Sequence, residues 1–133
     1  MNAILDTNVL ISGIFFSGPP RRILEAWSHG AFDLVLSPEI LDEYRRVADE
    51  LHSQYTSIEI GPILDLLVVR SRICLAEPLG TQVCTDPDDD KFLACAIAAS
   101  VHTIVSGDKS LLRVSGYQGI KVVRPRYFVE NYL

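Results

Sequence analysis

The chain has 133 residues, of which 48% are hydrophobic and 22% are charged, and its formal net charge is −5. This balance is typical of a globular protein and excludes a disordered chain, and the length predicts one domain over residues 1–133. The three cysteines, without CxxC or Cys/His spacing, predict free thiols and exclude a zinc-finger site. No signal peptide is visible and no apolar run is long enough to span a bilayer, so we expect a cytoplasmic protein without a membrane partner.

Short β-rich runs alternate with longer helical stretches along the chain. In chain order, we expect a strand at 2–6, a turn or short helix at 7–15, a helix at 21–30, a strand at 32–37, a helix at 38–51, a helix within 57–70, a strand at 72–76, a helix at 86–100, a strand at 102–106, a short helix at 107–114, a strand at 120–123 and a terminal helix at 124–133. Pro19 or Pro20 in a first turn, and Ser37 as an N-cap, indicate two of the helix starts. The alternation predicts an α/β fold of three layers (α/β/α), with a central parallel sheet of about five strands.

Two aspartates are expected at the carboxyl edge of this sheet, where α/β proteins bind their ligands. Asp6 interrupts the first apolar stretch, and a buried charge is unfavourable there unless something pairs with it. Asp108 follows the strand at 102–106 after a single glycine. An aspartate after a strand often only caps the next helix, and that alternative stays open for either residue alone. Two aspartates at the same edge favour a functional site.

Glu43 is a third candidate. The helix at 38–51 has one apolar face, which is formed by Ile40, Leu41, Tyr44, Val47, Ala48 and Leu51. Glu43 falls at the margin of this face and is the least solvent-directed acid of the helix. A salt bridge with Arg46 is an equally open explanation for it.

The densest group of acids is "DPDDDKFLACA" at 86–96, which begins with four carboxylates in five positions. The positive end of a helix dipole tolerates acids in the first turn, and this explains Asp86, Asp88 or Asp89. Asp90 lies at helical spacings before the apolar residues of the helix. We therefore expect Asp90 to point inward along the packed face.

Converging carboxylates with no matching lysine or arginine repel one another, and a divalent cation removes that repulsion. Carboxylate oxygens suit Mg²⁺ or Mn²⁺, as one or two ions. Such an ion can lower the pKa of bound water and neutralise charge on a phosphoryl oxygen. No histidine lies near the predicted edge and no glycine-rich phosphate loop is present, so other hydrolytic chemistries find no support.

Four segments, taken in order, carry a resemblance to a known family. They are "ILDTNVLIS" at 4–12, "SPEILDEYRRV" at 37–47, "DPDDDKFLACAIAA" at 86–99 and "IVSGDKSLL" at 104–112. On these segments the chain resembles a PIN domain, the metal-dependent ribonuclease fold found in VapC-type toxins and in RNA-processing nucleases. The resemblance implies a PIN-like fold, with catalysis and metal binding by Asp6, Glu43, Asp90 and Asp108. It further implies that Asn8 and Ser106 orient ligands or substrate, and that Asp86 or Asp88 is an additional or substitute acid.

The resemblance also implies an activity and partners. We expect an endoribonuclease that cleaves single-stranded RNA through a metal-activated water, leaving a 5′-phosphate and a 3′-hydroxyl. The family implies the toxin of a toxin–antitoxin system, with a cognate antitoxin protein as partner, and a homodimer. Arg21 and Arg22 are candidate contacts to the RNA backbone, because their helix is expected to begin near the metal edge.

Two alternatives remain beside the nuclease. The "ILDTN" opening is also similar to that of haloacid-type phosphatases, which would use Asp6 as a nucleophile. Those enzymes need a second acid two residues further on, and that position is Asn8. A non-catalytic PIN-like binding module is the other alternative, and the complete set of acids argues against it.

Overall fold

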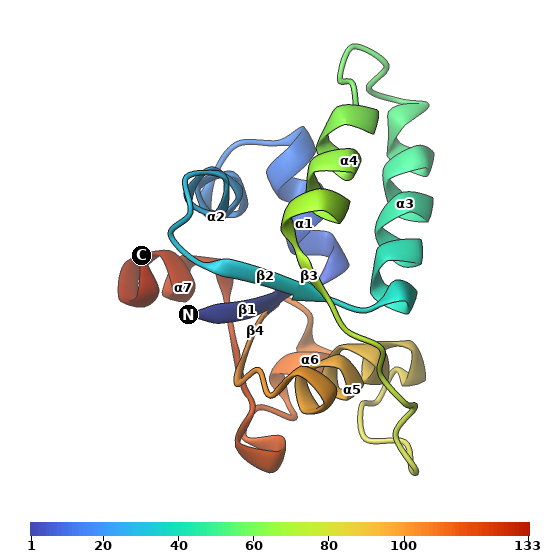
Figure 1. Cartoon of the computed structure of the whole chain (residues 1–133), viewed down its shortest axis with the longest axis vertical. Helices are drawn as coiled ribbons and strands as arrows, with labels where there is room; N and C mark the ends of the chain where they lie inside the picture. The colour runs from blue at the N-terminus through green and yellow to red at the C-terminus, as the bar shows by residue number, and fades with distance from the viewer.

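A parallel sheet of five strands forms the middle layer of the structure, in the order β3-β2-β1-β4-β5 (Figure 1). The structure is a computed structural model that describes residues 1–133. The strands are β1 (Asn2–Leu5), β2 (Asp33–Leu36), β3 (Arg72–Ile73), β4 (Thr103–Val105) and β5 (Lys121–Val123). All four pairings are parallel, so the predicted sheet is confirmed.

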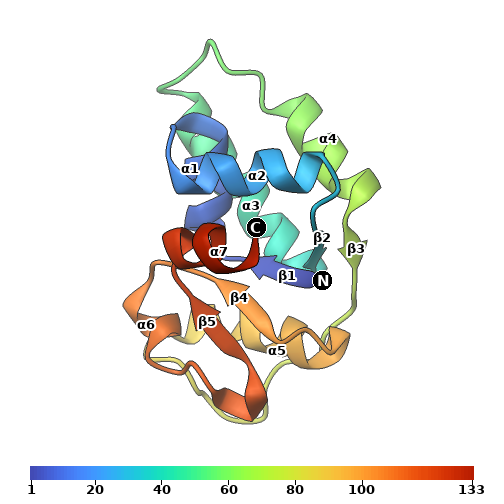
Figure 2. The same ribbon diagram turned by 90° about the vertical axis from the view of Figure 1, so that its left-hand side faces the viewer.

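Helices cover both faces of the sheet. They are α1 (Thr7–Phe15), α2 (Pro19–Ser28), α3 (Pro38–His52), α4 (Gly61–Arg70), α5 (Asp90–Ala99), α6 (Lys109–Leu112) and α7 (Pro125–Tyr132), with short 3₁₀ helices η1 (Pro87–Asp89) and η2 (Tyr117–Gly119). α1 to α4 lie on one side of the sheet and α5 and α6 on the other, and α7 lies beside α2 (Figures 1 and 2). The three-layer α/β/α fold is therefore confirmed. None of the helices has the length and apolar character needed to cross a membrane.

β1 is the central strand, and it positions the residues at the carboxyl edge. Ala3, Ile4 and Leu5 are wholly buried, as expected for a parallel strand that is covered on both faces. The pairing with β4 continues one residue past the end of β1, because the Asp6 N–H donates to the Val105 carbonyl at 2.9 Å. Asp6 is therefore held in line with β1 and beside the end of β4.

α3 is anchored to the same end of the sheet by two polar contacts. Ser37 Oγ accepts a hydrogen bond from the Ile40 N–H at 3.3 Å, which confirms the predicted N-cap. The wholly buried Tyr44 side chain donates from its hydroxyl to the carbonyl of Leu5, the last residue of β1, at 2.5 Å. These contacts hold the first turns of α3 against the end of β1, so that Glu43 can reach the edge of the sheet.

β3 is shorter than the strand predicted at 72–76. Only Arg72 and Ile73 pair with β2, and the ladder ends with a hydrogen bond from the Cys74 N–H to the Leu36 carbonyl. Leu36 is the last residue of β2, so an edge strand that continued further would have no neighbour to pair with. The chain from 74 to 86 therefore contains no helix or strand.

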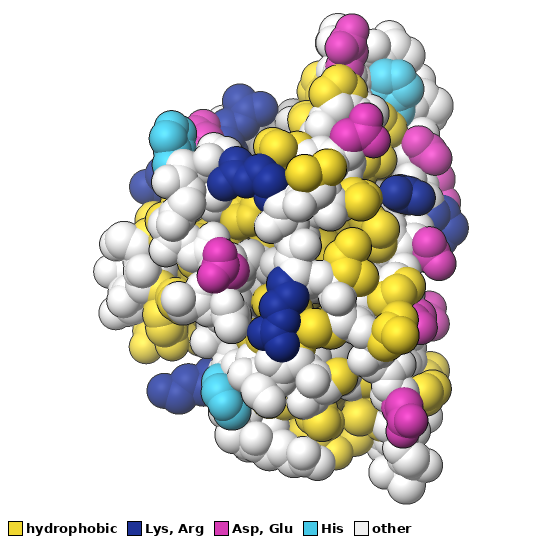
Figure 3. Space-filling model, viewed as in Figure 1, with side chains coloured by type: hydrophobic (Ala, Val, Ile, Leu, Met, Phe, Trp, Pro, Cys, Tyr) yellow, Lys and Arg dark blue, Asp and Glu magenta, His cyan; other side chains and the backbone are white.

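Hydrophobic side chains remain exposed along α4 and the chain that follows it (Figure 3). We call this surface the α4–β3 strip, and its members are Leu66, Val69, Ile73 and Leu75. Val69 and Leu75 are the most exposed, at 80% and 85%. Gathered apolar surface of this kind is typical of protein interfaces.

Close packing of α1 on α2 at Gly13 gives a stability prediction. A Cβ at this position would lie 2.6 Å from Leu24 Cδ1 and 2.8 Å from the Pro20 carbonyl oxygen. We expect Gly13→Ala to lower the free energy of unfolding by about 1–3 kcal/mol, measured by urea denaturation, because the backbone oxygen has little room to move. Gly61→Ala is the control, since a Cβ there meets nothing within 4 Å. Equal effects of the two substitutions would contradict the packing argument.

Candidate functional site

Ser106 links two aspartates at the carboxyl edge of the sheet. Its hydroxyl donates to Asp6 Oδ2 at 2.6 Å, and its oxygen accepts a hydrogen bond from the Asp108 N–H at 3.0 Å. Ser106 is wholly buried, and Asp6 is only 4% exposed. Asp6 and Asp108 therefore lie at the same edge of the sheet, as predicted, and Ser106 lies between them.

Burial makes the charged form of Asp6 unfavourable. Burial raises the pKa of the Asp6 carboxyl above its ordinary value, the hydrogen bond from Ser106 opposes the change, and the nearby charge of Asp108 adds to it. A cation at this point would offset both the cost of burying the Asp6 charge and its repulsion by Asp108.

Asp108 is also a helix cap. Its Oδ1 accepts a hydrogen bond from the Ser110 N–H at 3.0 Å, at the start of α6. The capping role left open by the sequence is thus present. It does not exclude a role in the site, because the same carboxylate lies close enough to raise the pKa values of Asp6 and Asp89.

Asp89 is the buried acid of the group at 86–90, with 8% of its surface exposed. Its Oδ2 is buried without a hydrogen-bond partner. The pKa of Asp89 is raised to about 7, chiefly by burial; a hydrogen bond from Ser110 works in the opposite direction, and the charges of Asp108 and Asp6 contribute to the rise. Asp6, Asp89 and Asp108 therefore influence one another, and we call them the carboxylate cluster.

Asp90 does not point toward this cluster, and the expectation that it is the inward-facing acid is wrong. Its two carboxylate oxygens accept hydrogen bonds from the Val83 N–H at 3.0 Å and the Cys84 N–H at 2.7 Å. Burial alone would raise the pKa of Asp90, but these two backbone donors lower it below its ordinary value. The face of α5 that carries Asp90 is covered by the preceding segment of chain, so Asp89 takes the inward position.

Asp86 and Asp88 are both exposed. Asp86 caps η1, since its Oδ1 accepts a hydrogen bond from the Asp88 N–H at 3.0 Å. The Asp88 side chain makes no hydrogen bond and no ion pair. The helix-end role that the sequence left open for Asp86 is therefore present, and neither residue contributes a buried carboxylate.

Glu43 reaches the edge from α3 and is paired with a lysine. Its Oε1 lies 2.6 Å from Lys91 Nζ and 3.8 Å from the Arg46 guanidinium, and its Oε2 accepts a hydrogen bond from the Thr7 hydroxyl. The premise that no lysine or arginine accompanies these acids is therefore wrong for Glu43. The sequence did not lead us to predict Thr7 or Lys91 as site residues. Each directly follows a predicted acid, and this adjacency is the signal that could have identified them.

Arg21 and Arg22 lie away from the cluster. α1 has nine residues, and at 1.5 Å per residue it carries the chain about 13 Å from Asp6 before α2 begins. The Arg21 guanidinium donates to the Ile14 carbonyl at 3.5 Å, in the last turn of α1. The expectation that α2 begins near the carboxylates is therefore wrong. Asn8 does lie in the first turn of α1, where it is exposed and its side chain makes no hydrogen bond.

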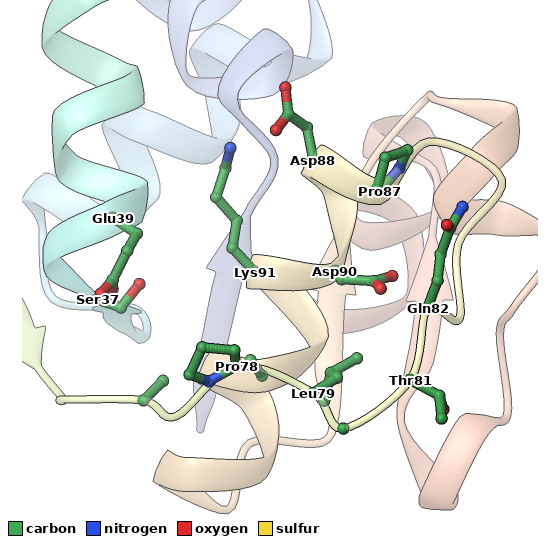
Figure 4. Close-up of a pocket in the computed structure, with 13 residues that line it drawn as sticks. Ser37, Glu39, Pro78, Leu79, Thr81, Gln82, Pro87, Asp88, Asp90 and Lys91 are labelled. Carbon is green, nitrogen blue, oxygen red and sulfur yellow. The ribbon is translucent and has the colours of Figure 1, made fainter.

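A cavity of about 530 Å³ opens beside the cluster. It lies between the start of α3, the segment at 76–82 and the start of α5 (Figure 4). Only three of its 13 lining residues are hydrophobic. Lys91 lines the cavity and also pairs with Glu43, so the cavity and the acids share a border.

The donors of the cluster fit a hard divalent cation. All are carboxylate oxygens, the buried Asp89 Oδ2 lacks a partner, and the acids raise one another's pKa values. No three His, Cys, Asp or Glu side chains are grouped tightly enough to hold a metal ion as they stand. A bound cation would therefore have to draw the carboxylates closer together.

Comparison with known proteins identifies the family. Residues 2–110 match the PIN domain, and the chain belongs to this family. No curated protein matches the sequence. PIN domains are generally nucleases that use divalent metals, so membership supports a nuclease-type function with a nucleic acid as substrate.

The raised pKa of Asp89 gives a pH-dependent prediction for the protein in EDTA. Because Asp89 holds its proton up to about pH 7 in the folded state and only to about its ordinary value when unfolded, it destabilises the fold as the pH rises between these values. At pH 8 we expect Asp89→Asn to have a higher free energy of unfolding than the wild type, by on the order of 2 kcal/mol, and so to unfold at a higher urea concentration. This difference should disappear near pH 4. The exposed Asp65→Asn is the control, and a pH-independent difference for Asp89→Asn would contradict the assignment.

Proposed function

We propose that this PIN domain is an endoribonuclease that depends on Mg²⁺ or Mn²⁺ and cleaves single-stranded RNA, leaving a 5′-phosphate and a 3′-hydroxyl. The observation that carries the proposal is the carboxylate cluster, in which burial above all raises the pKa values of Asp6 and Asp89. Ionisable groups with perturbed pKa values at the ligand-binding edge of an α/β sheet are typical of functional sites. Family membership supports the reaction class.

Asp6, Asp89 and Asp108 would hold the cation, with Glu43 beside them. Asp89 replaces Asp90 in this set, because both oxygens of Asp90 are bound to the backbone of the preceding segment. When bound, the cation supplies a Lewis acid that lowers the pKa of water and neutralises charge developing on the phosphoryl group.

The surrounding side chains orient these acids. Ser106 holds Asp6 through its hydroxyl, and Thr7 and Lys91 hold the two oxygens of Glu43. Lys91 also places a positive charge at the border of the site, where it can attract an RNA phosphate. This matters because the formal net charge of −5 otherwise opposes the binding of RNA. Arg21 and Arg22 stay candidates only for contacts with RNA that extends beyond the site.

Asp108→Asn tests the proposal without removing the helix cap, since asparagine caps helices as well as aspartate does. We expect Mg²⁺-dependent cleavage of single-stranded RNA to fall by about 100-fold or more, because one anionic ligand is lost. Mg²⁺ should raise the Tm of the wild type and leave that of the variant almost unchanged. Asp65→Asn, on the exposed face of α4, should behave like the wild type in both measurements.

Four outcomes would contradict the proposal of a metal-dependent nuclease. Full cleavage in excess EDTA would exclude dependence on a metal, and products with cyclic phosphates would indicate attack by the RNA 2′-hydroxyl. A covalent phosphate on Asp6, detected as a mass increase, would favour the haloacid-type phosphatase instead. The exposed Asn8 argues against that phosphatase, because it occupies the place of the required second acid. RNA binding without any cleavage would identify a non-catalytic PIN-like module.

We also propose a homodimer and the role of a toxin that is neutralised by a cognate antitoxin. The exposed α4–β3 strip supports a protein partner on that side of the molecule. Light scattering should give twice the chain mass for the wild type and a larger monomer fraction for Val69→Asp. Induced expression should arrest growth, and Asp108→Asn should relieve the arrest. A monomeric wild type, or growth unaffected by expression, would reject the corresponding part of the proposal.

A further inference from the structure

The cavity beside the carboxylate cluster has the size and lining of a small-molecule subsite. Its volume of about 530 Å³ lies within the range of pockets that enclose ligands. In Figure 4, Glu39 on α3 lies on one side, Thr81 and Gln82 of the segment at 76–82 lie on the other, and Lys91 on α5 lies between them. Polar side chains from three separate segments therefore line this one, partly open cavity.

Two residues connect this cavity with the cluster. Lys91 lines it and contacts Glu43 at 2.6 Å, and the charge of Glu43 in turn acts on Asp6 of the cluster. Asp88 lines it and is the chain neighbour of the buried Asp89. A strand of RNA whose phosphate lies at the cluster can therefore extend toward the cavity with an adjoining base.

Of the charged side chains in the lining, those without a partner are carboxylates. The Lys91 ammonium is bound to Glu43, and the Asp90 oxygens are bound to two backbone N–H groups. The Gln82 amide nitrogen donates to the carbonyls of Cys84 and Thr85, at 2.9 Å and 3.2 Å, which leaves its oxygen for a ligand.

Two carboxylates of the lining have no partner in the protein. Glu39 and Asp88 are exposed, and neither forms a hydrogen bond or an ion pair through its side chain. Ionised carboxylates accept hydrogen bonds and cannot donate them. The cavity therefore disfavours a phosphate group and favours a ligand with several N–H donors.

We propose that this cavity binds a base of the RNA substrate and selects guanine, with Glu39 as the residue that recognises it; the inference rests on the proposed nuclease function. Guanine presents two neighbouring donors, N1–H and the N2 amino group, and one carboxylate can accept from both. Adenine and cytosine each offer one amino group on this edge, and uracil offers only its single N3–H. Unpaired bases of single-stranded RNA are read on the edge that carries these groups.

Nucleoside binding tests the selection without requiring cleavage or a metal. Guanosine, inosine and uridine are titrated into the ¹⁵N-labelled protein in EDTA, and amide shifts are followed by NMR. Guanosine should shift the amides of Glu39, Thr81 and Gln82. Inosine, which lacks only the N2 amino group, should bind about tenfold more weakly, because one hydrogen bond to a charged acceptor is lost. Uridine, which presents only its N3–H on this edge, should also bind more weakly than guanosine.

Glu39→Gln is the matched variant, because it keeps the size of the side chain and replaces one acceptor oxygen with a donor. It should bind guanosine and inosine equally, whereas Glu130→Gln, on α7, should retain the wild-type preference. Equal binding of guanosine and inosine by the wild type, or guanosine shifts absent from the cavity, would overturn the inference. An unchanged preference in Glu39→Gln would also overturn it.

Cleavage mapping then separates this inference from the function on which it rests. On an RNA of mixed sequence, the wild type should cut beside guanines, and Glu39→Gln should cut with at least about tenfold less preference for guanine. Metal-dependent cleavage with no guanine preference overturns the subsite and leaves the nuclease intact. Guanosine binding in the cavity without any cleavage supports the subsite and rejects the nuclease.

Discussion

The hydrogen bond from the Ser106 hydroxyl to Asp6 joins the ends of β1 and β4, and the arrangement of the site depends on it. It follows the last backbone contact between these segments, from Asp6 to Val105, and the same hydroxyl oxygen receives the Asp108 N–H. One buried serine thus aligns two acids from distant parts of the chain. Without this donor, burial and the charge of Asp108 would be opposed only by the backbone hydrogen bond from Thr7, and the neutral form of Asp6 would be favoured more strongly.

Much of this arrangement follows from the sequence, for one geometric reason. Parallel strands end at the same edge of a sheet, so finding the ends of two strands is enough to place Asp6, Ser106 and Asp108 near one another. The layers follow from the same alternation of strands and helices. The length of β3 does not follow from the sequence, because pairing at the edge of a sheet depends on where the neighbouring strand ends. The residues at 72–76 contain no pattern that indicates the end of β2.

The inward acid of the group at 86–90 required the structure. Helical phase favours Asp90, which is the first residue of α5. Asp89 belongs to the 3₁₀ helix before α5, in which each residue advances by a larger angle, so the phase of α5 does not report its direction. The phase also says nothing of Val83 and Cys84, whose backbone covers Asp90. The pair between Lys91 and Glu43 joins different helices across 48 positions of sequence, and only the packing of α3 beside α5 brings them together.

The position of Asp90 has a consequence for how such a domain can diversify. Its carboxylate fixes the far end of the segment at 76–82 to the first turn of α5, while Asp89, one residue earlier, faces the cluster. The wall of the cavity and the acids are therefore attached to the same turn through two different, neighbouring residues. Substitutions or insertions within 76–82 can reshape the wall while Asp90 keeps its anchor, and the acids need not move. Ligand preference and chemistry can in this way evolve separately within a single chain.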